Sequence, residues 1–121
     1  MRKLIFIAFM VMSVCGYAQK YEVGTTTAVW KAPAAADFLH AKAIGVKYVE
    51  VAFNQCYRGV PVDEVIPRIK EMKAKIDSAD IEVWSIHLPF SRTLDISVLD
   101  DRLRKENVDF MAEMIELCAM F

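Results

Sequence analysis

The stretch VKYVEVAF, residues 46–53, is the clearest strand signal in the chain. It is rich in β-branched and aromatic residues and has the length of one strand, so we predict a strand over Val46–Phe53. Alternation along a strand separates Glu50 from the more apolar set Val49, Val51 and Phe53. We expect the apolar set to meet helices, which leaves Glu50 on the opposite face.

Strand-like and helical runs alternate on both sides of this stretch. Further strands are predicted over Tyr21–Thr27 and Ile81–Leu88. Helices are expected from Pro33 to Ile44, from Glu64 to Ala79 and from Ser97 to Phe121. Asp80 lies in the turn before the third strand, where a residue that tolerates positive φ is favoured. Alternation of this kind is typical of parallel strands joined by crossover helices.

Local signals predict where the helices begin and end. Pro33 suits a first helical turn, and Gly45 suits a left-handed helix end. Pro67 is tolerated only in a first turn, so the helix that contains it is expected to start late. Ser97 is the expected N-cap of the last helix, with Asp100 three residues further on in a capping-box arrangement.

The spacing of the strands predicts the fold class. They start at Tyr21, Val46 and Ile81, 25 and 35 residues apart, which is about the repeat of a (β/α)8 barrel of roughly 250 residues. Parallel sheets need cover on both faces, and three units cover only one. We therefore expect an α/β fold consisting of the first three βα units of an incomplete TIM barrel, truncated after the apolar stretch Met114–Phe121. A small, complete three-layer α/β protein is the alternative.

The first eighteen residues have the pattern of a signal peptide. Arg2 and Lys3 precede an unbroken apolar run, Leu4–Met12, which is too short to span a bilayer as a helix. We expect cleavage after Ala18, a mature barrel part over residues 19–121, and an exported protein, periplasmic or secreted, with no stable membrane anchor. The alternatives are a retained anchor and a lipoprotein anchored at Cys15, against which the large residue before it speaks.

The charge of the mature part argues against a nucleic-acid partner. Cleavage removes two of the 15 basic residues, which leaves 13 against 16 acidic residues and a formal net charge of −3. Non-specific affinity for DNA comes from a basic surface, so nucleic acid is not expected as a partner. Cys56 and Cys118 remain after cleavage, and their spacing neither requires a disulfide nor matches a metal site.

Glu50 is the first candidate for chemistry. It interrupts the apolar run Tyr48–Phe53, and a carboxylate inside a strand is costly to bury unless it is paired or lies at a wet site. Its position near the carboxyl end of a parallel strand is where α/β folds place their sites. We interpret Glu50 as a site carboxylate that faces the barrel lumen. A structural carboxylate paired with a basic neighbour is the alternative.

His87 is the second candidate, at the carboxyl end of the third predicted strand. By alternation it shares a face with Val83 and Ser85, and the serine marks that face as the polar, lumen-facing one. A histidine there can ligate a divalent metal, bind a substrate hydroxyl or move protons near neutral pH. Its phase with Glu50 on the neighbouring strand favours function over an ordinary histidine bonded to a backbone carbonyl.

Three weaker candidates lie near the same end of the strands. Trp30 and Phe90 are aromatic residues that could stack on a sugar face, and Arg92 could hold a phosphate or carboxylate. Ordinary packing or a solvated charge is the competing interpretation of each. The sequence contains no glycine-rich phosphate loop, nucleophile elbow or paired metal-ligand spacing.

Two segments resemble a known family. EVWSIHLPF at residues 82–90, followed by LDIS at residues 94–97, is similar to the sugar phosphate isomerase/epimerase family. These are the xylose-isomerase-like TIM barrels, related to the endonuclease-IV-type barrels. GVKYVEV at residues 45–51 resembles the family's second strand with its glutamate. The similarity spans residues 21–121, about the first third of the family's barrel.

The resemblance implies an enzyme that isomerises or epimerises sugars with a divalent metal, with no distinction among Mn, Mg, Co and Zn. Such a metal polarises a carbonyl and stabilises the enediolate. His87 resembles the family's third-strand histidine, which approaches the substrate and binds metal in the endonuclease branch. Glu50 resembles the glutamate near the sugar. The main metal ligands are expected beyond Phe121, so the fragment alone is expected to be inactive.

Three functional hypotheses follow. The first is a sugar isomerase/epimerase-like enzyme, whose export suggests a non-phosphorylated sugar or a glycoside as substrate. The second is a non-catalytic carbohydrate-binding barrel. The third is an endonuclease-IV-type metallohydrolase, against which the acidic charge and the export signal speak. The fragment is also expected to expose apolar edges and to self-associate.

Overall fold

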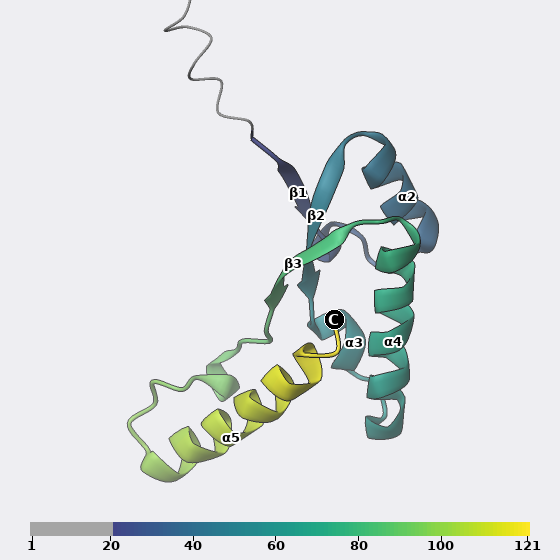
Figure 1. Ribbon diagram of the computed structural model, residues 1–121. Coiled ribbons are helices and arrows are strands. Elements are labelled where there is room, and N and C mark those ends of the chain that lie inside the picture. Colours follow the sequence, from purple (N-terminus) through teal and green to yellow (C-terminus); the bar gives the residue numbers. More distant parts are fainter. Residues whose placement is uncertain (1–20) are drawn as a thin grey trace, which may run out of the picture.

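The computed structural model describes residues 21–121, and the expected signal peptide and Cys15 lie outside this range. Three parallel strands form one sheet in the order β1–β2–β3. They are β1 (Val23–Thr26), β2 (Val46–Ala52) and β3 (Glu82–His87). The α-helices are α2 (Ala35–Ala43), α3 (Asn54–Tyr57), α4 (Val62–Ser78) and α5 (Asp101–Cys118). The predicted mixed α/β fold with a parallel sheet is confirmed (Figure 1).

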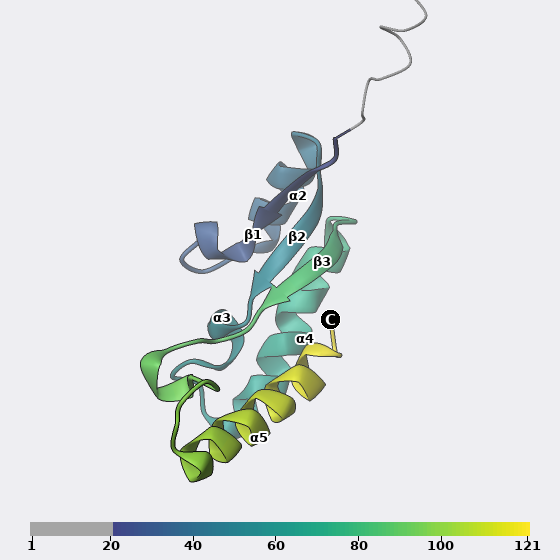
Figure 2. The ribbon, with the colours of Figure 1, turned by 90° about the vertical axis from the view of Figure 1, so that its left-hand side faces the viewer.

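One face of the sheet is covered by α2 and α4, as both views of the ribbon show (Figures 1 and 2). Val49, Val51 and Phe53 are fully buried on that face, where they belong to one apolar cluster with Ile69 and Ile76 of α4. The predicted division of the second strand into two faces is therefore confirmed, because its three apolar members enter the core and Glu50 does not.

The other face of the sheet is open within the described residues. Trp84 of β3 is 73% exposed there and lies edge-on against Tyr48, with 5.4 Å between ring centroids. Glu50 and His87 keep 41% and 48% of their side-chain surface accessible. In a (β/α)8 barrel, the face of the sheet that lies away from the helices lines the lumen.

The pairing of β2 with β3 contains a one-residue shift. Val49 pairs with Val83, but the next residue, Glu50, pairs with Ser85, so Trp84 is an extra residue on β3. Val83 packs against the buried cluster, and the prediction that it shares a face with His87 is wrong. Alternation assumes regular pairing, and a bulge breaks it at one residue.

Several element ends differ from the prediction. The helix expected to start late begins at Val62, and Pro67 lies inside it as its sixth residue. Because proline lacks an N–H, Pro67 cannot donate the helical hydrogen bond to the carbonyl of Asp63. The acidic side chains of Asp63 and Glu64 lie in the first turn, where negative charge stabilises the start of a helix. The segment after β2, expected as a loop, contains the short helix α3.

The N-cap of the last helix is Asp100 and not Ser97. The Asp100 carboxylate accepts a hydrogen bond from the Leu103 backbone N–H at 2.9 Å. Ser97 instead donates its N–H and its hydroxyl to the carboxylate of Asp95, at 2.8 and 2.6 Å. Those bonds lower the pKa of Asp95. A carboxylate that follows the serine by three residues thus takes the capping role expected of the serine.

The end of α2 follows the prediction more closely than its start. Gly45 has φ +96°, as expected for a left-handed helix end, and Asp80 has φ +52° before β3. The helix itself begins at Ala35, two residues after Pro33, and the carboxylate of Asp37 accepts a bond from the Ala34 N–H at 2.8 Å. Leu39 and Ile44, expected on the apolar side with Phe38, are exposed.

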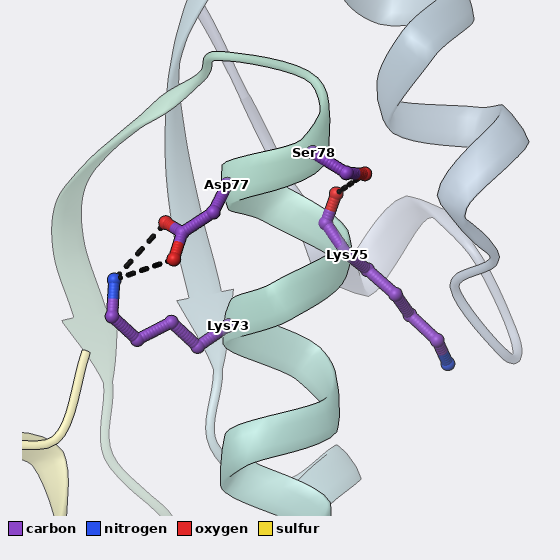
Figure 3. A network of polar contacts seen from close by, with 4 residues as sticks. All are labelled: Lys73, Lys75, Asp77 and Ser78. Atoms are coloured by element: carbon purple, nitrogen blue, oxygen red, sulfur yellow. Dashed lines mark hydrogen bonds and ion pairs between the residues drawn. The ribbon is translucent and has the colours of Figure 1, made fainter.

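One charged pair and one hydrogen bond lie near the carboxyl end of α4 (Figure 3). Lys73 contacts both carboxylate oxygens of Asp77 at 3.0 Å, and the Ser78 hydroxyl donates to the Lys75 carbonyl at 2.7 Å. Such contacts keep the last turn regular before the chain reverses into β3.

In the described part of the chain, no helix is both long and apolar enough to cross a membrane.

Candidate functional site

Glu50 and His87 lie together on the open face of the sheet. Glu50 is near the carboxyl end of β2 and His87 is the last residue of β3. Register places His87 beside Ala52, two residues beyond Glu50. The Glu50 Oε1 atom lies 3.9 Å from the His87 Nδ1 atom, a contact that becomes an ion pair when the imidazole is protonated. The two strongest sequence candidates are thus neighbours in space.

Ser85 completes a polar group with these two residues. Its hydroxyl donates to the Glu50 Oε2 atom at 3.4 Å, so the two carboxylate oxygens face different partners. In the sequence, Ser85 only marks the polar face of the strand. Its contact with Glu50 was missed because the pairing register is not readable from one strand.

Phe90 extends the site beyond the end of β3. Its ring centroid lies 5.7 Å from that of His87, at an interplanar angle of 57°, and the residue is 79% exposed. An exposed aromatic ring beside an imidazole can pack on the apolar part of a ligand while the ring nitrogens of the histidine bind its polar groups.

Arg92 lies further out, in a short 3-10 helix over Arg92–Leu94. It lines an open groove of about 700 Å³ together with Phe90, Ile96, Met111 and Ile115. Phe90 therefore belongs both to the site, through its contact with His87, and to the groove that Arg92 lines. The expected role of Arg92 in holding an anionic group stays a prediction.

Trp30 packs with the helix layer. Its ring lies edge-on to Phe38 of α2, with 5.2 Å between centroids, and its backbone carbonyl accepts a bond from the Gln55 side chain at 2.8 Å. This contact is ordinary packing, the alternative to a binding role for Trp30. Stacking of Trp30 on a substrate stays a prediction.

Two positioning residues behind the site were not found from the sequence. Thr27 follows β1, is fully buried, and its hydroxyl accepts a bond from the Ala52 N–H at 2.8 Å. Gln55 donates to the Thr27 carbonyl at 3.0 Å as well as to Trp30. These bonds tie the carboxyl ends of β1 and β2 together. In the sequence, Thr27 is only a threonine at the end of a predicted strand, and such residues are too common to single out.

The described residues do not make a metal site by themselves. Within residues 21–121, no group of three or more His, Cys, Asp or Glu side chains is placed to hold an ion. Glu50 and His87 provide two donors of a kind that divalent metals accept, but Zn²⁺ sites typically use at least three protein ligands. No step of the chemistry is therefore assigned to a metal on these residues alone.

Comparison with known families identifies the chain. The family model described as "Xylose isomerase-like TIM barrel" matches residues 38–121, more than half of the sequence. The chain belongs to this family. The matched residues of the xylose isomerase-like barrel begin in α2 and include Glu50, Ser85 and His87, whereas β1 and Trp30 lie before them. Comparison with curated proteins and with solved structures gave no match.

Proposed function

We propose that the chain belongs to a sugar isomerase/epimerase-like enzyme that binds its carbohydrate at the carboxyl ends of β2 and β3. The observation that supports this most is the contact of 3.9 Å between Glu50 and His87 on the open face of the sheet. A carboxylate and an imidazole from adjacent strands can bind the hydroxyls of one sugar ring from one side.

The proposed chemistry is proton transfer beside a sugar carbonyl. Histidine is a common acid or base in catalysis, and the Glu50 carboxylate lies 3.9 Å from His87. Phe90 is the proposed packing surface for the sugar ring, and Trp30 and Arg92 are proposed as outer substrate contacts.

A divalent metal is proposed only for the complete barrel. In that barrel the ion would polarise the sugar carbonyl. We propose that its main ligands lie outside the described residues, with His87 as the candidate ligand within them. The isolated chain is therefore proposed to bind sugar without turning it over.

The proposed ligand is a small non-phosphorylated sugar or a glycoside, met outside the cytoplasm. Export is supported by the basic and apolar pattern of residues 1–18. Nucleic acid is not a proposed partner, because a net charge of −3 after cleavage provides no basic surface. A non-catalytic carbohydrate-binding barrel is the second candidate, favoured by the exposed ring of Phe90 beside His87.

Titration of the full chain with monosaccharides and simple glycosides, followed calorimetrically, tests the proposal. We expect Glu50→Gln and His87→Asn each to weaken sugar binding by about tenfold or more, because a hydrogen bond to a charged group contributes about 1.5–3 kcal/mol. Glu113→Gln on α5 and His40→Asn on α2 are the matched controls and should leave the affinity unchanged. Equal affinity in all four variants, or no binding of any sugar, would refute the proposed site. Cleavage of abasic DNA by the protein would favour the endonuclease alternative.

A further inference from the structure

We infer that the loop before α2 (residues 30–34) and the helix α4 form a second ligand pocket, which takes a small dicarboxylate between Lys31 and Arg68. The pocket has a volume of about 180 Å³, and a cavity of about 150 Å³ is enough to hold benzene. It lies on the helix-covered side of the sheet, away from Glu50 and His87. The inference goes beyond the proposed function and does not depend on it.

Two hydrogen bonds fix the loop that forms one wall of the pocket. Gln55 of α3 donates its side-chain N–H to the Trp30 carbonyl at 2.8 Å, and Lys75 of α4 donates to the Pro33 carbonyl at 3.1 Å. Lys31 lies between these two anchored carbonyls and is exposed. A wall that is fixed before binding lowers the entropy cost of ordering the site around a ligand.

The facing wall is the side of α4 from which Lys75 extends, away from the Lys73–Asp77 pair (Figure 3). Arg68 and Glu71 lie on the same wall, one and two turns before the end of the pocket at Lys75. The wall therefore carries two cations and one carboxylate, and the loop adds a third cation.

The charges in the pocket are unbalanced. Glu71 lies 2.7 Å from Lys75 and pairs with it. Arg68 has Glu64 at 3.8 Å, and both of these side chains are more than half exposed, so that pair is weak. Within residues 21–121, Lys31 takes part in no ion pair. Two cations on different walls are therefore available to an anion.

The floor of the pocket is apolar. Met72 and Cys56 line it, are 6% and 1% exposed, and belong to the core cluster. Burial raises the pKa of the Cys56 thiol to about 11, and the positive charges of Arg68 and Lys75 act in the opposite direction. The basic side chains thus lie close to the floor, which itself provides packing surface and no charge.

These features fit a dicarboxylate better than a single inorganic anion. One carboxylate can accept the parallel N–H groups of Arg68, and the other can meet the ammonium group of Lys31. The short carbon chain between them then packs on Met72. Phosphate or sulfate would concentrate its charge at one centre and would leave the apolar floor without contacts.

Calorimetric titration of the full chain with succinate tests the pocket, with acetate and inorganic phosphate as comparison anions at constant ionic strength. We expect succinate to bind more tightly than either. Lys31→Gln and Arg68→Gln should each weaken succinate binding by about tenfold or more, because each removes a charged hydrogen-bond donor. Lys70→Gln removes the same charge from an exposed position of α4 outside the pocket and is the matched control.

A filling variant separates a defined pocket from a diffuse basic surface. Ala32 lines the pocket and is exposed, so Ala32→Leu should occupy part of the volume and abolish succinate binding without changing any charge. Circular dichroism of each variant checks that the fold is retained.

Four results would overturn the inference. They are no binding of succinate, phosphate or acetate binding as tight as succinate binding, equal affinity in Lys31→Gln, Arg68→Gln and Lys70→Gln, and unchanged affinity in Ala32→Leu. Glu50→Gln and His87→Asn should leave succinate binding unchanged, so failure of the proposed sugar site and failure of this pocket are distinguishable.

Discussion

Cys56 is a buried thiol just beyond the carboxyl end of β2. The residue is 1% exposed and belongs to the apolar core, and Cys118 of α5 packs against the same cluster. Both thiols are free. Burial raises the pKa of Cys56 to about 11, with the thiol of Cys118 as a smaller cause in the same direction. At the residue scale this makes Cys56 part of the packing and a poor nucleophile.

This pKa predicts how stability depends on pH. A thiol whose pKa is raised from 9.0 to about 11 on folding stabilises the folded state below pH 9, and the effect is lost as pH rises toward 11. We expect the free energy of unfolding to fall by up to about 2 kcal/mol over this range, measured by urea denaturation. Cys56→Ala should flatten the dependence and Cys118→Ala should largely retain it. An equally steep fall in Cys56→Ala would contradict the assignment.

At the scale of elements, the loop between β3 and α5 shows how a local competition for hydrogen bonds determines a helix start. Ser97 and Asp100 both have side chains suited to an N-cap. The carboxylate of Asp95 engages Ser97 through two bonds, and Asp100 is left to cap the Leu103 N–H. The helix therefore begins at Asp101.

The capping assignment predicts unequal effects of two alanine substitutions. Asp100→Ala should lower the free energy of unfolding by about 1 kcal/mol, the usual effect of losing an N-cap, with an added loss of the favourable charge at the helix start. Ser97→Ala should have a smaller effect, because its bonds lie in an exposed turn. Chemical denaturation of both variants compares them. A larger loss in Ser97→Ala would restore the serine as the cap.

At the scale of the whole molecule, residues 21–121 cover the sheet on one face only. Among the described strands, β3 pairs with β2 alone, so its other edge presents unpaired backbone groups. Trp84 stands on the open face of the same strand and is 73% exposed. An exposed edge and an exposed apolar ring on one strand are the features that favour association between chains.

We therefore expect the chain to self-associate through β3. Sedimentation velocity should show an average mass that rises with concentration. Trp84→Lys should shift the distribution toward monomer, since it places a charge on the open face. Leu99→Lys is the matched control, because Leu99 is 95% exposed but lies in the loop before α5. A monomer with a cooperative thermal transition at all concentrations would contradict this prediction.

The amino-acid sequence alone determined the features that depend on residues close together in the chain. The residues of β2 divide correctly into two faces, and Gly45 and Asp80 adopt positive φ where the chain must turn. The alternation of strands and helices was enough to predict a parallel sheet, and Glu50 and His87 could be selected because they interrupt or end apolar strands.

Only the tertiary structure decided the features that depend on a partner. The bulge at Trp84, and with it the contact of Ser85 with Glu50, exists only in the pairing of β3 with β2. Trp30 packs on Phe38 because α2 folds back over the sheet, which no local pattern specifies. The physical reason is the same in each case: a side chain's periodicity is set by its own strand or helix, whereas register and packing are set by the neighbour.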